Sequence, residues 1–173
     1  MNEGMIHPIV KFGNPVLEKT AEPVTDFGAH LKRLVDDMFE SMYAAKGVGL
    51  AAPQIGVSKR LAVIDISFKE DPNATLVLAN PEIIHIEGKQ TQSEGCLSIP
   101  EFREAVTRPK RVTVRAQDIH GKWYETTGED LLARALLHET DHLNGKLYIA
   151  HLSALKRDMI KRKIRKLMKA GAW

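Results

Sequence analysis

The apolar residues between positions 31 and 42 recur every three or four residues. This spacing places them on one face of a helix, and it predicts an amphipathic helix over about 25–45. The next segment, KGVGLAAPQIGV at 46–57, contains three glycines and a proline. Such a composition disfavours a continuous helix, so we expect the first helix to be followed by a loop-like segment.

Three later segments are rich in branched side chains and predict β-strands. They are RLAVIDIS (60–67), TLVLANPEIIHIEG (75–88) and RVTVRAQD (111–118). The third segment continues through a glycine-containing turn into DIHGKWYETT (118–127). This continuation predicts a β-hairpin.

Two more helices are expected in the C-terminal third of the chain. One would start near Thr127, with Asp130 as a capping partner, and end at Gly145. Its buried stripe would consist of Leu131, Leu132, Ala135 and Leu136. The other, about 153–169, would have its apolar side formed by Leu155, Met159, Ile164 and Leu167.

This order of elements predicts an α+β fold. We expect a single domain over 1–173, with antiparallel or mixed sheets around the helix that ends at Gly145 and a basic helix at the C-terminal end. The sequence contains no internal repeat and no low-complexity linker that would indicate a second domain.

Composition narrows the class of protein. The 173 residues are 43% hydrophobic and 27% charged, as in a globular domain that buries its core without disulfides. The only cysteine is Cys96, which excludes an intrachain disulfide and favours a reducing compartment. No apolar run suits a signal peptide or a membrane span. The sequence therefore predicts a cytoplasmic protein without membrane association.

The net charge of +3 is distributed unevenly along the chain. Positions 156–169 hold eight Lys or Arg residues and one acid, Asp158, whereas the rest of the chain is slightly acidic. Such a basic segment can bind nucleic-acid phosphates. The alternative interpretation is an ordinary solvated helix face, which is the commonest meaning of such a charge run.

The candidate chemistry lies in LLHETDHLNG, residues 136–145. On a helix, His138 and His142 share one face and can both point at one ion. Glu139 lies about 100° round the helix, within reach of a water molecule at that ion. Two histidines with an adjacent glutamate are typical of metal-dependent hydrolases, in which the ion acidifies a water molecule and a carboxylate takes its proton. Random shuffling of this composition gives the pattern roughly 0.02 times per chain. The alternative is two imidazoles on a solvated helix face.

A protein zinc site usually has at least three protein ligands, so a third one is needed. The protease pattern HExxHxxGxxH fails because Tyr148 stands where its last histidine would be, and no glutamate follows Glu139. His151 and Asp158 remain downstream, but their spacing does not favour them. The strong candidate is Cys96 in QSEGCLSIP (92–100), since a thiolate with two imidazoles is a known catalytic set. A buried structural cysteine is the alternative.

Taken together, three segments resemble those of the peptide deformylases. The chain has GVGLAAPQ at 47–54, EGCLS at 94–98 and HETDH at 138–142, in the order found in that family. The resemblance covers nearly the whole chain. It implies a metal-dependent hydrolase that removes the formyl group from the N-terminal formyl-methionine of nascent polypeptides and releases formate.

The resemblance also implies roles for the matching residues. The implied metal ligands are Cys96, His138 and His142. Glu139 would be the general base and then the general acid, and Gln54 with the backbone N–H of Leu97 would form an oxyanion hole.

The implied substrate-binding residues are Val48, Gly49, Glu94 and Arg103, with Arg103 near Glu94. For Arg103 the alternative is surface pairing, and for GVGL it is an ordinary loop. Leu131 and Ala135 would be neighbours of the methionine pocket, with core packing as the alternative.

Some positions differ from relatives of this family. Leu137 stands where many members have glutamine, and Arg134 replaces an apolar residue seen in some. Asp141 matches an acid of the family, which we expect to stabilise the helix or support a ligand instead of binding the metal.

The resemblance implies one divalent metal ion, with Fe²⁺ as the native ion and Ni²⁺ or Co²⁺ as substitutes, whereas ligand softness alone would favour Zn²⁺. In some members a C-terminal helix docks at the ribosome, so the basic helix at about 153–169 predicts a ribosome contact. Two alternative functions are a peptidase that cuts internal bonds and a nucleic-acid-binding module built on the basic helix.

Overall fold

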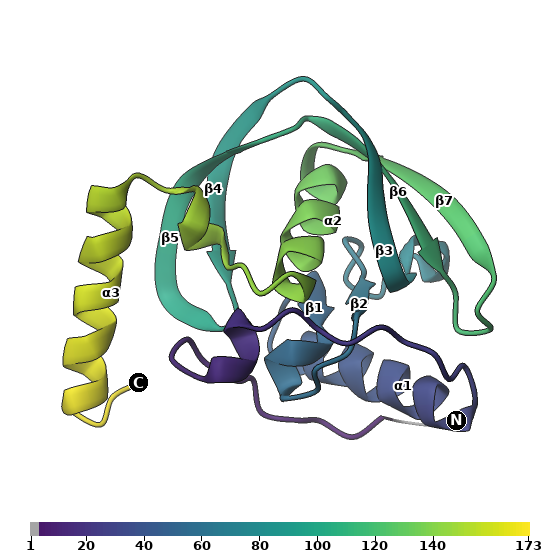
Figure 1. The fold of residues 1–173 in the computed structure, drawn as a ribbon, viewed down its shortest axis with the longest axis horizontal. Coiled ribbons are helices and arrows are strands. Elements are labelled where there is room, and N and C mark those ends of the chain that lie inside the picture. Colours follow the sequence, from purple (N-terminus) through teal and green to yellow (C-terminus); the bar gives the residue numbers. More distant parts are fainter. Residues whose placement is uncertain (1–3) are drawn as a thin grey trace.

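Two antiparallel β-sheets enclose one helix in the computed structural model, which describes residues 4–173 (Figure 1). The α-helices are α1 (Ala29–Ala44), α2 (Asp130–Leu143) and α3 (Ala154–Lys169). The strands are β1 (Gly49–Ala51), β2 (Leu61–Ile64), β3 (Leu76–Glu87), β4 (Gln90–Cys96), β5 (Ile99–Arg108), β6 (Arg111–Gln117) and β7 (Trp123–Glu129). Short 3-10 helices are η1 (Pro15–Glu18), η2 (Ala52–Ile55), η3 (Pro72–Ala74) and η4 (Tyr148–His151).

The larger sheet has the strand order β1-β2-β3-β6-β7, and β4 pairs with β5 in a separate hairpin. All of these pairings are antiparallel. Helix α2 lies between the larger sheet and the β4–β5 hairpin, and α1 lies below β1 and β2 in the view of Figure 1. This arrangement is a single-domain α+β fold and confirms the predicted class.

Helix α2 is buried over most of its surface because sheets cover it from two sides. Its buried residues are Ala133, Arg134, Ala135, Leu136, Leu137, His138, Glu139, Thr140, His142 and Leu143. Leu131, which we expected to be buried, is 50% exposed. The predicted buried stripe was therefore partly wrong: Ala135 and Leu136 are buried, but the prediction assumes a helix that packs on one face only.

The start of α2 also differs from the prediction. The helix begins at Asp130 because Thr126 and Thr127 still belong to the sheet, where they pair with Val114 and Thr113. Asp130 has a φ of 53°, and the residue before it makes no side-chain capping hydrogen bond. The predicted capping role of Asp130 was wrong.

The other strand predictions hold, with two omissions: β1, which lies in the segment expected to be loop-like, and the β4–β5 hairpin. The segments at 60–67, 75–88 and 111–118 contain β2, β3 and β6, and β6 forms the predicted hairpin with β7. Helix α1 begins at Ala29, four residues later than expected. The β4–β5 hairpin was missed because its strands, QTQSEGC and IPEFREAVTR, carry many polar side chains and few branched apolar ones.

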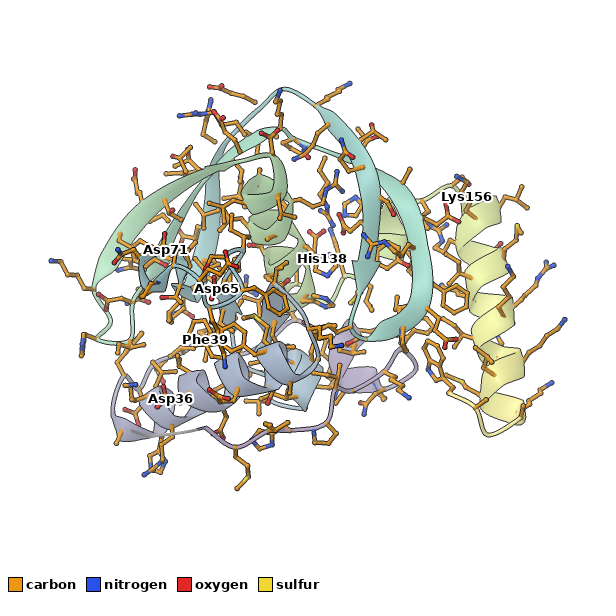
Figure 2. The ribbon with its side chains drawn as sticks, turned by 180° about the vertical axis from the view of Figure 1, so that it is seen from behind. Asp36, Phe39, Asp65, Asp71, His138 and Lys156 are labelled. Atoms are coloured by element: carbon orange, nitrogen blue, oxygen red, sulfur yellow. The ribbon has the colours of Figure 1, made fainter. Side chains whose placement is uncertain are left out.

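Helix α3 starts where predicted, after Ser153, whose side chain accepts a hydrogen bond from the backbone N–H of Lys156. Its buried residues are Ile160 and Ile164, whereas Leu155 and Met159 are exposed, so the predicted apolar side was partly wrong. The helix lies at the edge of the molecule beside β5 (Figures 1 and 2). Within residues 4–173, no helix is long and apolar enough to cross a membrane.

Candidate metal centre

Helix α2 and the end of β4 bring together Cys96, His138 and His142. One potential ligand atom from each residue lies within 4.8 Å of those of the other two. The Cys96 Sγ is 3.3 Å from the His142 Nε2, which is 3.2 Å from the His138 Nε2. Burial and the neighbouring His138 lower the pKa of His142 well below its ordinary value. A lowered pKa favours the neutral imidazole of His142, which is the form that binds a metal ion, and one sulfur with two imidazole nitrogens is a donor set that fits a divalent ion.

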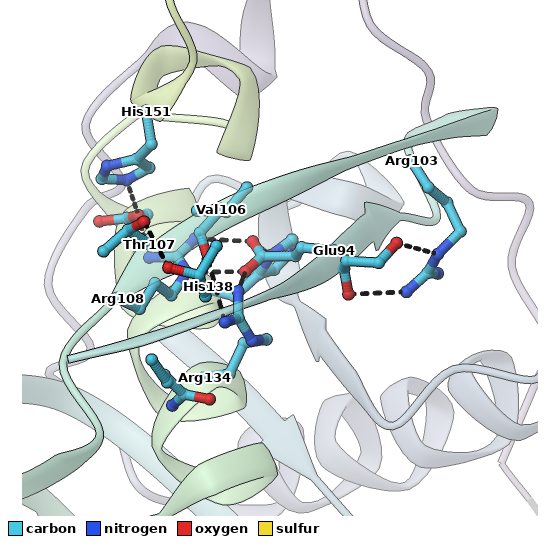
Figure 3. A network of polar contacts seen from close by, with 12 residues as sticks. Glu94, Arg103, Val106, Thr107, Arg108, Arg134, His138 and His151 are labelled. Atoms are coloured by element: carbon cyan, nitrogen blue, oxygen red, sulfur yellow. Dashed lines mark hydrogen bonds and ion pairs between the residues drawn. The ribbon is translucent and has the colours of Figure 1, made fainter.

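His138 is oriented by a buried carboxylate from the neighbouring hairpin. Its Nδ1 is 2.6 Å from Glu94 Oε2, which leaves Nε2 facing the other two ligands. Glu94 is 4% exposed, and it also accepts hydrogen bonds from Arg108 and Arg134 (Figure 3). Burial alone would raise the pKa of Glu94, but the hydrogen bonds and charges of Arg108 and His138 hold this pKa far below the usual range.

The register of the β4–β5 hairpin explains which arginine reaches Glu94. Glu94 lies opposite Glu104, and because side chains alternate along a strand, Arg108 points to the same face. Arg103 lies opposite Gly95 and points to the other face, where its guanidinium donates to the Ser93 Oγ and carbonyl oxygen. Figure 3 shows Arg103 apart from the cluster around Glu94. The expectation that Arg103 neighbours Glu94 was therefore wrong, and Arg108 and Arg134 take that place.

Glu139 directly follows the first histidine, and its carboxylate has almost no hydrogen-bond partners. Its Oε1 is buried and accepts no hydrogen bond from residues 4–173. Burial raises the pKa of Glu139 to about 7. A Cβ on Gly49 would lie 2.5 Å from the Glu139 Oε2, so only a glycine lets β1 approach this closely.

Gln54 is fixed with its amide nitrogen directed at the cysteine segment. Its Oε1 accepts from the backbone N–H of Ala51 at 3.0 Å, and its Nε2 donates to the Ser98 Oγ at 3.1 Å. The same Nε2 is 3.6 Å from the Cys96 Sγ. The amide N–H groups of Gln54 are therefore held beside Cys96, one of the three potential ligands.

Two of the three potential ligands, Cys96 and His138, line a cavity of about 740 Å³ together with Glu139 and Gln54. Among its lining residues are Val48, Gly49, Gln54, Glu94, Cys96, Leu97, Arg103, Leu131, Arg134, Ala135, His138 and Glu139. Every residue that we expected to act on substrate thus borders the same space. Leu131 and Ala135 lie in this wall as well as on α2.

The comparisons with known proteins agree with this site. A model of the polypeptide deformylase family matches residues 6–158. The chain belongs to this family. A peptide deformylase from Acidobacterium capsulatum is 63% identical over 169 residues, which cover 98% of this chain and 99% of that protein. A crystal structure of a peptide deformylase from Legionella pneumophila matches with a TM-score of 0.89 at 48% identity and covers 96% of this chain and 98% of that one. The peptide deformylase from Thermus thermophilus gives a TM-score of 0.85 at 42% identity, with 93% and 94% covered.

Members of the polypeptide deformylase family are hydrolases that remove the N-formyl group from nascent polypeptides, and this is the activity of the chain. The family depends on a metal ion, and the cluster of one cysteine and two histidines could hold it. The alternative of a peptidase that cuts internal bonds is thereby removed.

The positions that differ from other deformylases have different surroundings. Leu137 is buried in the core cluster around α2 and lies outside the lining of the cavity. Arg134 lines the cavity but is fixed by Glu94 and by the carbonyl oxygen of Val106.

Asp141 accepts hydrogen bonds from Arg108 at 3.1 Å and from His151 at 2.8 Å. His151 is therefore engaged by Asp141 and is not part of the cysteine–histidine cluster.

Two residues of the site were missed from the sequence. Arg108 is 4% exposed and could have been found from the alternation Val106-Thr107-Arg108, in which Val106 marks the inward face of the strand. Ser98 is fully buried and accepts the hydrogen bond from Gln54. No local pattern identifies Ser98, because its partner lies 44 residues earlier in the chain.

Proposed function

We propose that Cys96, His138 and His142 bind one divalent metal ion and that Glu139 is the general base and acid of formyl-group removal. The observation that carries this proposal is the convergence of the three ligand atoms within 4.8 Å beside a buried carboxylate. The orientation of His138 by Glu94 and the lowered pKa of His142 support it further.

A divalent ion in this site would supply Lewis acidity for water and for the formyl oxygen. Glu139 accepts the proton of the attacking water, and it donates a proton to the amine that leaves when the C–N bond breaks. The amide of Gln54 and the backbone N–H of Leu97 donate hydrogen bonds to the formyl oxygen as negative charge develops on it. Losing one such donor typically lowers the rate by about 10²–10³. The products are formate and a free N-terminal methionine.

The rest of the cavity is proposed to bind the substrate. Val48, Leu131 and Ala135 present apolar surface for the methionine side chain, and Gly49 allows close approach of the substrate backbone. Arg103 lines the same cavity and remains a candidate for contacts with the peptide. Glu94 contributes by holding His138, because its carboxylate is engaged by Arg108, Arg134 and that histidine.

For the metal we propose Fe²⁺ as the native ion, with Zn²⁺, Ni²⁺ or Co²⁺ able to occupy the site. A thiolate with two imidazoles accepts all of these ions. Because a thiolate-ligated ferrous ion is sensitive to oxygen, the metal should be analysed after anaerobic purification.

We further propose that the protein acts in the cytoplasm on formyl-methionyl nascent chains and contacts the ribosome through α3. The exposed face of this helix carries most of the basic residues between 156 and 169, which can meet phosphates. Deleting 156–173 would be a poor test, because it removes the buried Ile160 and Ile164. Each such side chain contributes about 1.5–3 kcal/mol by its burial, a large share of the stability of a small domain.

The test of the catalytic proposal uses three peptides that differ only at the amino group: formyl-Met, acetyl-Met and free Met. Anaerobically metallated protein should release formate from the first and leave the other two intact. Cys96→Ala should lose bound metal and turnover together. Glu139→Gln should retain the metal and lose turnover, which separates the ligand from the base. Metal loss in Glu139→Gln, or full activity in Cys96→Ala, would contradict the assignment.

A further inference from the structure

The indole of Trp173 lies against the body of the domain, next to the substrate cavity but outside its lining. Its Nε1 donates a hydrogen bond to the carbonyl oxygen of Phe12 at 2.8 Å. Its ring meets the ring of Phe102 edge-on, with the centroids 6.2 Å apart. Both aromatic residues are half-buried and pack on the core cluster that contains Ile160 and Ile164 of α3.

The chain reaches this position through a defined helix end. The backbone N–H of Gly171 donates to the carbonyl oxygen of Met168, and that of Ala172 donates to the carbonyl oxygen of Leu167. With Gly171 at a φ of 69°, these two bonds form a Schellman motif, which reverses the chain after α3. Trp173 is thereby directed back toward β5.

Phe102 is a wall of the substrate cavity. It lines the cavity together with Pro100 and Glu101, and Glu101 has a φ of 72°. The metal-ligand end of this cavity is assigned to the formyl group, and the wall of Val48, Leu131 and Ala135 to the methionine side chain. The Phe102 wall is left for the peptide residues that follow the methionine.

Trp173 is also connected to the cysteine segment by a chain of hydrogen bonds through the backbone of Phe12. Phe12, whose carbonyl oxygen accepts from the indole, donates its own N–H to the carbonyl oxygen of Ser98 at 2.8 Å. Ser98 in turn holds the side chain of Gln54. Trp173 therefore has two routes to the site: a direct one through Phe102, and an indirect one through Phe12 and Ser98.

We propose that Trp173 is a positioning residue for substrate binding, which fixes the Phe102 wall of the cavity for peptide residues beyond the methionine. The direct ring contact favours the Phe102 route, because an edge-on aromatic pair is worth more than its buried area alone. The proposal rests on the assignment of this cavity to the substrate. It connects α3, through its C-terminal turn, with the affinity of the site for longer peptides.

The test compares formyl-Met-Ala-Ser with formyl-methionine amide on nickel-loaded protein, measuring KM and kcat separately. Trp173→Ala should raise KM for the tripeptide about three- to tenfold, as expected for loss of an aromatic pair, and leave kcat unchanged. KM for formyl-methionine amide should change little. Trp173→Phe, which keeps a ring against Phe102 but loses the hydrogen bond to Phe12, should restore most of the affinity. Leu155→Ala, an apolar truncation on the exposed face of α3, is the matched control.

Binding of the product peptide Met-Ala-Ser, measured by calorimetry, should weaken in parallel in Trp173→Ala, with unchanged metal content. An unchanged KM for the tripeptide in folded Trp173→Ala would overturn the proposal. A joint fall of kcat and metal content would also overturn it, because it would indicate the route through Phe12 and Ser98. If Trp173→Ala does not fold, Trp173→Leu keeps much of the apolar volume and carries the same expectation. Wild-type protein without turnover on either substrate would contradict the proposed function, and product binding would still decide the role of Trp173.

Discussion

The Arg134 Nη1 donates to the Glu94 Oε1 at 2.6 Å, inside a cluster in which the other oxygen of Glu94 contacts the Nδ1 of His138. A side chain that differs from the apolar residue of some relatives thus supports the orientation of a proposed metal ligand. Arg108 makes the second ion pair with the same carboxylate.

Replacing Arg134 with methionine should destabilise the protein and weaken metal binding. Removing one partner of a buried ion pair commonly costs about 3–5 kcal/mol, and we expect a somewhat smaller loss because Arg108 remains. Metal affinity should fall about 10–100-fold, as for other residues that orient a ligand. Urea unfolding and titration against a chelator measure the two effects. Arg103→Met, which removes only the exposed contacts with Ser93, is the control, and equal behaviour of the two variants would refute the supporting role of Arg134.

Gly49→Ala should reduce turnover and leave metal binding intact. The new Cβ would lie 2.5 Å from the Glu139 Oε2, so the carboxylate must move. A displacement of a catalytic group by about 1 Å can lower kcat about 10²-fold. Gly28→Ala, an exposed position where the Cβ meets only the Asp26 side chain at 3.2 Å, is the control. Wild-type kcat in folded Gly49→Ala would show that the base tolerates the methyl group.

Asp65 should contribute stability that is lost in acid. Burial by itself would raise the pKa of this carboxyl. Hydrogen bonds from Ser67, Tyr43 and the backbone N–H of Lys69 outweigh that effect and lower the pKa to about 2. Because the folded pKa lies below the unfolded value of about 3.9, the contribution is complete above about pH 4 and disappears as the pH falls toward 2.

Asp65→Asn should therefore be less stable than wild type at neutral pH, and the difference should narrow between about pH 4 and pH 2. Denaturant unfolding at several pH values measures this. Asp36→Asn, which affects only an exposed pair with Lys32 on α1, is the control, because a surface ion pair contributes little to stability (Figure 2). A constant difference for Asp65→Asn across the range would contradict the pKa assignment.

Charge reversal on α3 should weaken ribosome binding without affecting short substrates. Arg162, Lys163 and Lys166 are exposed, so replacing all three with glutamate leaves the buried face unchanged. We expect reduced co-sedimentation with ribosomes, most clearly at low salt, and wild-type kcat/KM on formyl-Met-Ala-Ser. Glutamate at the exposed Lys59, Lys89 and Lys122 is the control with the same charge change. If both triple variants bind ribosomes equally, the contact does not involve α3 specifically.

The sequence by itself determined the elements whose signals are local. The spacing of His138 and His142 fixes both side chains on one face of a helix wherever that helix lies. The failure of the downstream ligand patterns at Tyr148 directed the search to Cys96, and the branched residues of β2, β3 and β6 predicted those strands. The start of α3 was likewise set by Ser153, whose side chain caps the helix.

Only the tertiary structure decided which residues support the site. The partners of Glu94 depend on the register of β4 against β5 and on the position of α2 beside that hairpin, and neither is encoded in a short stretch of sequence. The same is true of Trp173, which lies 161 residues from Phe12, the residue that it contacts. Periodicity predicts which way a side chain points along its own element, whereas contacts between distant elements depend on how the whole chain packs.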